Sequence, residues 1–476
     1  MLIFITMFDL GNLKKIDSSM FVTIILLCII GAINVFSTTY FPDKTASKFF
    51  FNQLLFYGIG FILFFIFSTF DYSKLKNKYV AFGVFFVTVG LLIAVLLFGD
   101  YAFEAKRWIV VGPFTIQPSE FSKVSIILIT AFCFTKGNIK RFERIKNIYK
   151  IKGKTFGEKL GMIATDKQFV KVLFSILALI SIVVLIILQK SLGNSVITVL
   201  IFLSLVYFSI DISFKSIIYL IITALIFNLS FHFVGLNGLK DSLGLTQINF
   251  DIFLWILSVV IIFYLIRKFT LKPLLTLAIV VIILPSSIVL GFVYNNVLQP
   301  YQRSRIENFI TPDSNESLGD NYNKEQAILA VGSGGIVGRG FLNGNVTNLG
   351  LLPFAFTDFA FAAFAEQFGF LGNIFLFCLY FFLIFKILSI ARSTKSQFGM
   401  LICSGVAVMI CLNAFQHIGM NMGILPITGV PLPFISYGGS AVLTIFLGMG
   451  LVSSIQIKSE TEEEDVVNLK DEMIKF

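Results

Sequence analysis

Long, continuous apolar runs constrain the fold of this 476-residue chain more than any other feature of its sequence. A hydrocarbon core roughly 30 Å thick takes about 20 helical residues to cross, and most of the runs approach or exceed that length. The runs are unbroken rather than alternating, which favours membrane helices over barrel strands. Only 13% of the residues are charged, against roughly 25% in soluble domains. The sequence therefore predicts an all-α fold, a polytopic transmembrane helical bundle that forms a single integral membrane domain over residues 1–476.

About twelve spans are expected in this bundle. They lie near 20–41, 50–70, 79–99, 120–135, 169–188, 192–210, 215–234, 252–268, 273–294, 361–391, 398–420 and 434–456. Pro426, Pro431 and Pro433 preclude a regular helix over 423–440, so this segment is predicted to be re-entrant or interfacial. An even number of crossings places both termini on one side of the membrane.

The basic residues predict which side that is, because loops rich in Lys and Arg stay in the cytoplasm. With a cytoplasmic N-terminus, the inside segments carry Lys14, Lys15, Lys74, Lys76, Lys78, Lys215, Arg267, Lys268, Lys272, Lys386, Arg392 and Lys395. The largest cluster predicts a basic cytoplasmic loop over 136–168, and residues 457–476 predict an acidic, solvated cytoplasmic tail. The net charge of +10 thus follows membrane topology, and no nucleic-acid partner is expected. The same alternation makes 295–360 an extracytoplasmic loop.

Polar, glycine and charged residues concentrate in one stretch, from about Gln299 to Gly369. Its charged residues include Arg303, Arg305, Glu307, Arg339, Asp358 and Glu366. Its glycine-rich part, 332–340, matches no nucleotide-binding fingerprint, because no strand precedes it and no Lys-Ser or Lys-Thr pair follows. Glycines of this kind let backbone approach a ligand closely, or they serve only packing and turns, and the sequence leaves both readings open. So much charge beside bilayer segments suggests an anionic, lipid-linked substrate.

Three segments carry a resemblance to a known family. They are KRWIVVGPFTIQPSEFSK (106–123), the run from YQRSR through GRGFLNG, LLPFAFTDF and AEQFGFLG (301–372), and GILPITGVPLPFISYGGS (423–440). In these motifs and their order the chain resembles the SEDS family of bacterial membrane proteins, and it looks closer to the rod-shape (RodA) branch than to the division (FtsW) branch. The family fold has about ten core spans and a large extracytoplasmic loop. The resemblance therefore implies about two extra spans here, within 209–270.

This resemblance implies a peptidoglycan glycosyltransferase of the bacterial cytoplasmic (inner) membrane. Such enzymes polymerise lipid II into glycan strands during cell-wall elongation, release undecaprenyl diphosphate, and work with a class B penicillin-binding protein. Asp358 matches the family's essential aspartate. A carboxylate there can accept the proton of an attacking sugar hydroxyl, a contribution of typically 10² to 10⁴ in rate. One base suffices, since diphosphate is a good leaving group. The alternative role for Asp358 is to cap the following helix.

The polyprenyl diphosphate predicts a set of cations near Asp358, because guanidinium forks and ammonium groups bind phosphate oxygens. The candidates are Arg107, Lys123, Arg303, Arg305 and Arg339. Glu120 lies three residues before Lys123, so the two share a helical face. Two roles stay open for this pair: its side chains contact the substrate, or they only neutralise each other's charge. Glu366, eight residues after Asp358, tunes it from the same face or is a packed polar residue. A divalent cation bridging Asp358 and the diphosphate would suit the chemistry, but no cluster of ligands requires one.

Some positions depart from the family pattern. The usual QPDLG reads QKSLG at 189–193, the usual glutamate after LP is Phe354, and His417 precedes IGM. Two other functions stay open beside the enzyme. One is a flippase that carries a lipid-linked precursor, since transporters also hold broken helices and buried charges. The other is a scaffold without catalytic activity that recruits the penicillin-binding protein.

Overall fold

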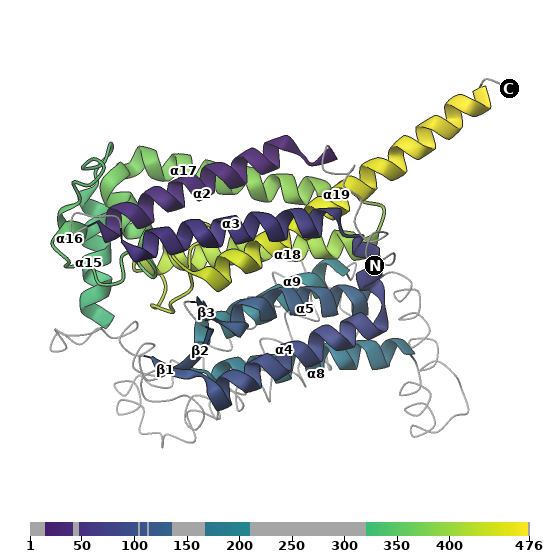
Figure 1. Ribbon diagram of the computed structural model, residues 1–476, viewed down its shortest axis with the longest axis horizontal. Helices are drawn as coiled ribbons and strands as arrows, with labels where there is room; N and C mark the ends of the chain where they lie inside the picture. The colour runs from purple at the N-terminus through teal and green to yellow at the C-terminus, as the bar shows by residue number, and fades with distance from the viewer. Residues whose placement is uncertain are drawn as a thin grey trace, which may run out of the picture. The chain divides into compact units, whose positions relative to one another are not determined.

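The computed structural model describes residues 15–40, 47–102, 105–111, 114–135, 167–209 and 320–474 (Figure 1). Eight of the helices in this part of the chain are long and apolar enough to cross a membrane. They are α2 (Ser18–Thr39), α3 (Lys48–Thr69), α4 (Lys78–Phe98), α8 (Lys167–Leu188), α9 (Leu192–Ser209), α17 (Ala360–Ser393), α18 (Gln397–Asn421) and α19 (Gly439–Ile474). The shorter α5 (Pro118–Phe134) is a ninth long apolar helix. Nine predicted spans thus coincide with helices, and those near 215–234, 252–268 and 273–294 lie outside the described residues.

Contacts divide the chain into two compact units. Residues 1–210 together with 304–476 form the first unit, and residues 211–303 form the second. Every described residue belongs to the first unit. The extra spans expected within 209–270, and all but the last two residues of the basic loop expected at 136–168, lie outside the described part of the chain. The single membrane domain therefore stays a prediction.

Polar residues start several of the long helices. Asp17, Ser47, Asn77 and Ser396 each accept a hydrogen bond from a backbone N–H in the first turn of the helix that follows. These caps satisfy donors that have no partner within the helix. The apolar runs therefore begin as helices at the positions where a short polar side chain precedes them.

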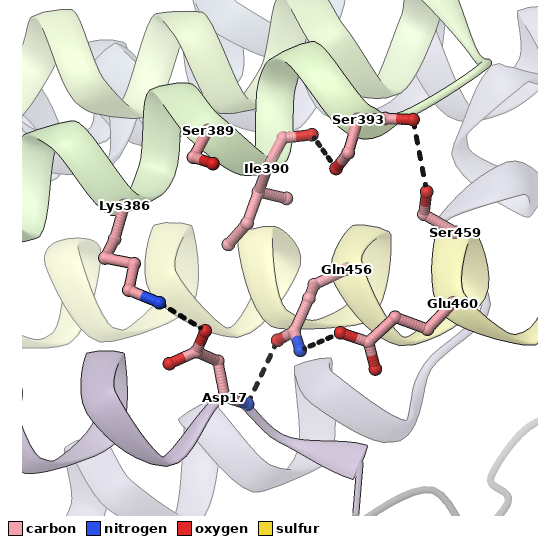
Figure 2. A pocket seen from close by; sticks show the side chains of 8 residues that line it. All are labelled: Asp17, Lys386, Ser389, Ile390, Ser393, Gln456, Ser459 and Glu460. Atoms are coloured by element: carbon pink, nitrogen blue, oxygen red, sulfur yellow. Dashed lines mark hydrogen bonds and ion pairs between the residues drawn. The ribbon is translucent and has the colours of Figure 1, made fainter.

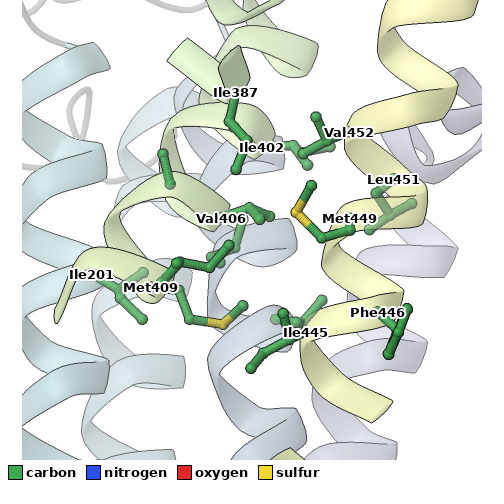
Figure 3. Close-up of a cluster of buried hydrophobic side chains, with 14 of the residues drawn as sticks. Ile201, Ile387, Ile402, Val406, Met409, Ile445, Phe446, Met449, Leu451 and Val452 are labelled. Carbon is green, nitrogen blue, oxygen red and sulfur yellow. The ribbon is translucent and has the colours of Figure 1, made fainter. Parts of the chain in front are cut away.

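Buried apolar side chains of α9, α17, α18 and α19 pack together in the core of the bundle. Figure 3 shows a cluster from these helices that includes Ile201, Ile387, Met409 and Ile445. Beside it α3 runs along α19, where a Cβ added to Gly60 would lie 2.3 Å from the Phe446 ring. Such small residues let membrane helices approach closely. The outer helices α3, α4, α8 and α17 instead carry many exposed large apolar side chains, as contact with lipid requires.

A small antiparallel sheet joins α4 to α5, an element that the all-α expectation missed. It consists of β1 (Asp100–Ala102), β2 (Ala105–Val111) and β3 (Phe114–Ile116), in the order β1-β2-β3. In β2, Trp108-Ile-Val-Val has the aromatic and β-branched residues typical of strands. The backbone N–H of Gln117 donates to Ser440 Oγ (2.7 Å), which ties the sheet to the start of α19. We call this the sheet end of the bundle.

The described part of the predicted loop 295–360 contains two further helices, α15 (Asp320–Ser333) and α16 (Asn345–Asn348). After α16 the chain turns through residues 349–359 into α17, which kinks at Gly369, where φ is 64°. Residues 422–438, between α18 and α19, form no helix, which confirms that part of the expectation from the prolines.

At the opposite end of the bundle, which we call the tail end, α19 continues as a helix through most of the predicted tail 457–476. Lys458 pairs with Asp71 (3.0 Å) and Lys386 pairs with Asp17 (3.0 Å) there. Figure 2 shows the second pair in a polar cavity of about 220 Å³, between α17, α19 and the start of α2. Burial raises the pKa of Asp17, but hydrogen bonds from Ser19, the backbone of Met20 and Lys386 leave it below its ordinary value of 3.8.

Candidate active site

Asp358 lies at the sheet end, in the turn that leads into α17. Its side chain is half-buried, and its backbone carbonyl accepts a hydrogen bond from Asn421 Nδ2 (3.1 Å). The helix begins only at Ala360, and Phe359 occupies the cap position without a side-chain hydrogen bond. Asp358 therefore projects from an irregular turn at the end of the bundle, and its position is fixed through its backbone.

Side chains of α18 cap the first turn of α17. The N–H of Phe361 donates to His417 Nε2 (3.4 Å), and the N–H of Ala362 donates to Asn421 Oδ1 (3.1 Å). These are two of the donors that a helix start leaves without a partner. The capping role that was the alternative for Asp358 is thus performed at these two positions by another helix.

The segment 428–437 faces the Asp358 turn. A Cβ added to Gly429 would lie 3.5 Å from Asp358 Oδ2, in van der Waals contact, so the backbone of the segment runs directly beside the carboxylate. Gly429 also has a φ of 68°, which a residue with a side chain rarely adopts. Further along, Ser436 Oγ donates to the carbonyl of Thr357 (2.8 Å). The turn and the segment are therefore held against each other on both sides of the carboxylate.

The predicted Glu120–Lys123 pair is present and lies deep in the bundle. Lys123 Nζ is 3.0 Å from Glu120 Oε2, and the two residues are 0% and 2% exposed. Asn413 Oδ1 accepts from Lys123 Nζ (3.3 Å), and Asn194 Nδ2 donates to Glu120 Oε1 (2.8 Å). Three helices, α5, α9 and α18, therefore enclose the pair. The amides satisfy charges that would otherwise be costly to bury.

A path of contacts joins this pair to Asp358. Asn194, which bonds Glu120, follows Gly193 at the start of α9. A Cβ on Gly193 would lie 2.6 Å from Val430 Cγ2, so α9 packs directly against the segment that faces Asp358. The ion pair is therefore joined through Asn194 and the start of α9 to the segment that faces Asp358.

Arg107, on β2, reaches the turn between α8 and α9. Its Nη2 donates to the carbonyl of Lys190 (2.6 Å), a residue in the left-handed region with φ at 59°. In the same turn Gln189 Nε2 donates to the carbonyl of Leu92 (2.9 Å). This turn holds the QKSLG sequence that departs from the family pattern. The guanidinium is half-buried at the sheet end, against the turn that leads to Gly193.

The structure gives Glu366 a supporting role at α16. Its carboxylate is fully buried and accepts from the N–H groups of Val346 (2.7 Å) and Thr347 (3.1 Å), and from Thr347 Oγ1 (2.6 Å). Because Asp358 precedes the first turn of α17, these two acidic residues do not share a helical face. Glu366 instead fastens the start of α16 to α17.

Arg339 has an exposed side chain, and its N–H donates to the carbonyl of Glu366 (3.0 Å). The flanking Gly338 packs so closely that an added Cβ would lie 2.1 Å from the carbonyl oxygen of Gln367. By contrast, nothing lies within 4 Å of a Cβ added to Gly332 or Gly335. Packing thus explains part of the glycine-rich stretch. Arg303 and Arg305 lie outside the described residues.

Among the described residues no group of three or more His, Cys, Asp or Glu side chains could hold a metal ion. Asp358 offers one carboxylate beside the 428–437 segment. Mg²⁺ commonly binds through one or two carboxylates and the phosphates of a substrate. The Asp358 carboxylate would therefore suit a divalent cation only if the diphosphate of the substrate supplied further ligands. Such a cation would neutralise the charge of the phosphates.

Sequence reasoning missed four polar residues that join these parts, namely Asn194, Asn413, His417 and Asn421. It noted His417 only as a departure from the family pattern. A usable signal was present, because amide and imidazole groups within apolar spans are costly unless they have partners. The sequence alone could not say that Asn194 and Asn413 serve the ion pair while His417 and Asn421 serve the Asp358 turn.

Comparisons with known proteins identify the family of this chain. The chain matches the family model described as cell cycle protein, for FtsW, RodA and SpoVE, over residues 17–240 and 242–461. It is similar to the peptidoglycan glycosyltransferase RodA of Treponema pallidum, at 30% identity over 94% of this chain and 99% of that protein. The peptidoglycan glycosyltransferase MrdB of Escherichia coli is 42% identical over 33% of this chain and 43% of its own length.

Solved structures show the same fold. One is a chain from a study titled as the structural coordination of polymerization and crosslinking by a peptidoglycan synthase complex, with a TM-score of 0.58 and 22% identity. It is matched over 93% of this chain and 97% of its own. The rod shape determining protein RodA of Thermus thermophilus has a TM-score of 0.52 and 20% identity, over 93% and 96% of the two chains. At such identities the likeness concerns the fold alone.

Proposed function

The chain belongs to the cell cycle protein family of FtsW, RodA and SpoVE, and from this membership we propose a peptidoglycan glycosyltransferase whose general base is Asp358. The substrate is lipid II, and the products are a longer glycan strand and undecaprenyl diphosphate. Similarity to RodA over nearly the whole chain supports a role in cell-wall elongation. The observation that carries the assignment of the base is the half-buried Asp358 carboxylate, which faces Gly429 at one end of the bundle.

The surroundings of Asp358 support its proposed role as a general base. The sugar hydroxyl of one substrate attacks the anomeric carbon of the other, a C–O bond forms there, and the bond to the diphosphate breaks. The hydroxyl proton passes to the Asp358 carboxylate, and the diphosphate leaves as an anion without needing a proton. The missing side chain at Gly429 leaves room beside Oδ2, and the hydrogen bond from Asn421 to the Asp358 carbonyl fixes the turn.

Arginine side chains are proposed to bind the diphosphate. Arg107, Arg303 and Arg305 are the candidates, and Arg339 is a further exposed guanidinium near α17. Lys123 differs from them, since its ammonium is enclosed with Glu120 and Asn413. Its burial favours support of the 428–437 segment over contact with substrate. Glu366 is likewise proposed to support the site by holding α16.

The partner and the orientation in the membrane belong to the same proposal. Multiple apolar helices and the family make this a multi-pass membrane protein. We place it in the bacterial inner membrane, with both termini in the cytoplasm and the sheet end outside, as the distribution of Lys and Arg favours. A class B penicillin-binding protein is the proposed partner, and the likeness to a chain of a peptidoglycan synthase complex supports it.

Polymerisation of labelled lipid II by the purified protein with its penicillin-binding protein tests this function. The partner's transpeptidase is blocked, so that only glycan strands form. Asp358→Asn is expected to lower the rate by about 10² to 10⁴, because it removes the base. Asp71→Asn, the same substitution at the tail end, serves as the matched control and is expected to leave the rate within a few-fold of the unmodified protein.

Equal strand synthesis by Asp358→Asn, with the complex intact, would remove Asp358 from the mechanism. If the unmodified protein makes no strands while a known polymerase works in the same assay, the enzyme reading is wrong. Movement of lipid II across vesicle membranes would then indicate a flippase. Binding of the partner without strand synthesis or lipid movement would indicate a scaffold.

A further inference from the structure

The last turn of α18 contacts both segments that flank the Asp358 carboxylate. Asn421 bonds the turn before α17, and His417, one helical turn earlier, bonds the 428–437 segment as well as α17. Neither residue is needed to build α18 itself, whose apolar side chains pack in the core. Two polar groups in a buried position, each with several partners, therefore call for a role in the site.

Asn421 uses both ends of its amide. Its Oδ1 accepts from the N–H of Ala362 (3.1 Å), while its Nδ2 donates to the carbonyls of Asp358 (3.1 Å) and His417 (2.8 Å). The side chain is fully buried. It therefore sets the distance between the backbone of Asp358 and the first turn of α17, and only an amide can provide this combination of acceptor and donors at once.

The hydrogen bonds of His417 define one tautomer of its ring. Nε2 faces the N–H of Phe361, a donor, so it must be the unprotonated acceptor. Nδ1 faces the carbonyl of Val430 at 2.8 Å, so it must carry the proton and donate. A neutral Nδ1–H imidazole satisfies both contacts, whereas protonation of Nε2 would place two donors face to face. Val430 follows Gly429, so this bond holds the backbone that faces Asp358.

We propose that His417 and Asn421 are positioning residues of the active site, which together hold the Asp358 turn and the 428–430 backbone at the spacing that the reaction requires. This inference rests on the function proposed above. Neither side chain touches the reacting atoms. Both act by fixing backbone on the two sides of the carboxylate, and His417 does so as a neutral Nδ1–H imidazole.

The rate test compares substitutions of similar size in the complex with the penicillin-binding protein. His417→Leu and Asn421→Leu remove the hydrogen bonds and are expected to lower kcat by about 10- to 100-fold, because small displacements of a catalytic group are costly. The KM for lipid II should stay within about 3-fold, since the diphosphate site is unchanged. His417→Gln restores a donor and an acceptor, so it should recover most of the lost kcat.

A matched control separates positioning from loss of fold. Asn373 is another buried asparagine, on α17 beyond the Gly369 kink and outside the contacts described here. Asn373→Leu makes the same chemical change and should leave kcat within about 2-fold. If Asn373→Leu lowers kcat as much as Asn421→Leu does, or if His417→Gln recovers no more activity than His417→Leu, then general disruption explains the losses and the proposal fails.

The tautomer offers a test that does not depend on activity. The chain has two histidines, so a His232→Gln background labelled with ¹⁵N-histidine reports His417 alone. We expect the NMR shifts of a neutral Nδ1–H ring throughout pH 5.5–8, a range in which an ordinary histidine near pKa 6.5 titrates. An Nε2–H ring, or one that titrates within this range, would overturn the assignment of its hydrogen bonds.

The outcomes distinguish a failure of the positioning role from a failure of the proposed function. Full activity of Asp358→Asn overturns the proposed base whatever His417 does. An inactive Asp358→Asn beside a fully active His417→Leu and Asn421→Leu overturns the positioning role alone.

Discussion

Removing one charge of the buried Glu120–Lys123 pair is expected to destabilise the protein far more than removing both. The two side chains lie 3.0 Å apart and are almost completely buried. Glu120→Gln or Lys123→Met alone leaves an uncompensated charge among apolar residues, at a cost of about 3–5 kcal/mol each. Together they leave a neutral pair of similar volume, and the new amide oxygen at position 120 can still accept from Asn194.

The sizes of these effects give a coupling energy that can be measured. The two single losses sum to roughly 6–10 kcal/mol, whereas replacing a buried ion pair by neutral groups of similar volume is often close to neutral. With about 2 kcal/mol allowed for the double variant, the double-mutant cycle should give a coupling of at least about 4 kcal/mol. Reversible unfolding in mixed detergent micelles provides the free energies for the four proteins. Additive losses would refute the reasoning, because they would mean that the two charges do not compensate each other.

Activity of the double variant then decides between support and substrate contact. We expect its KM for lipid II to stay within about 3-fold of the original, since the Lys123 ammonium is enclosed by Glu120 and Asn413. If Lys123 instead bound the diphosphate, loss of a charged hydrogen bond worth about 1.5–3 kcal/mol would raise KM by roughly 10-fold or more. That rise, in a double variant that is folded and binds the partner, would show that the pair contacts substrate despite its burial.

Two further predictions concern a close packing contact at one end of the bundle and an ion pair at the other. Gly338→Ala is expected to destabilise the protein by about 1–3 kcal/mol more than Gly335→Ala. Both glycines have positive φ, but only a Cβ at position 338 would clash with the Gln367 carbonyl. Equal losses of stability in thermal unfolding would contradict this prediction. Asp17→Asn keeps a good cap but loses the pair with Lys386, worth about 0.2–1 kcal/mol at this exposure. Because the pKa of Asp17 is lowered in the folded protein, the stability difference between the two proteins should be present at pH 7. It should disappear as the pH falls below 3.8 and through the lowered pKa. A stability difference that persists in acid would exclude the charge of Asp17 as its cause.

The long helices could be predicted because their signal is local. An apolar run such as that of α4 is too long and too uniform to be anything other than a span, so nine predicted spans coincide with helices. The sheet at 100–116 escaped prediction, because its short strands gain stability only by pairing and by the bond between Gln117 and Ser440. The cap of α17 escaped for a related reason, since its partners lie on α18 and are remote in sequence.

Within the site, the sequence predicted the pairing of Glu120 with Lys123, because three-residue spacing on a helix brings the side chains together. It could not predict that Asn194 and Asn413 enclose the pair, because this depends on how α5, α9 and α18 pack. It left two readings of Glu366 open, and the structure favours the packed polar residue over a shared face with Asp358. The sequence could not decide between them, because the start of α17 was not apparent from an apolar run that continues on both sides of Ala360.

The irregular segment 422–438 shows why a membrane fold of this kind needs polar residues in its helices. Backbone outside a helix must find its hydrogen bonds inside the protein, because lipid offers none. Tyr57 on α3 donates to the carbonyl of Phe434, and Tyr380 on α17 donates to that of Pro433. His417 on α18 does the same for Val430. Three helices thus supply donors to carbonyls that the prolines prevent from joining a helix. The same bonds fix the segment that faces Asp358, so the polar side chains that make irregular backbone tolerable in the bundle also determine the geometry of its active site.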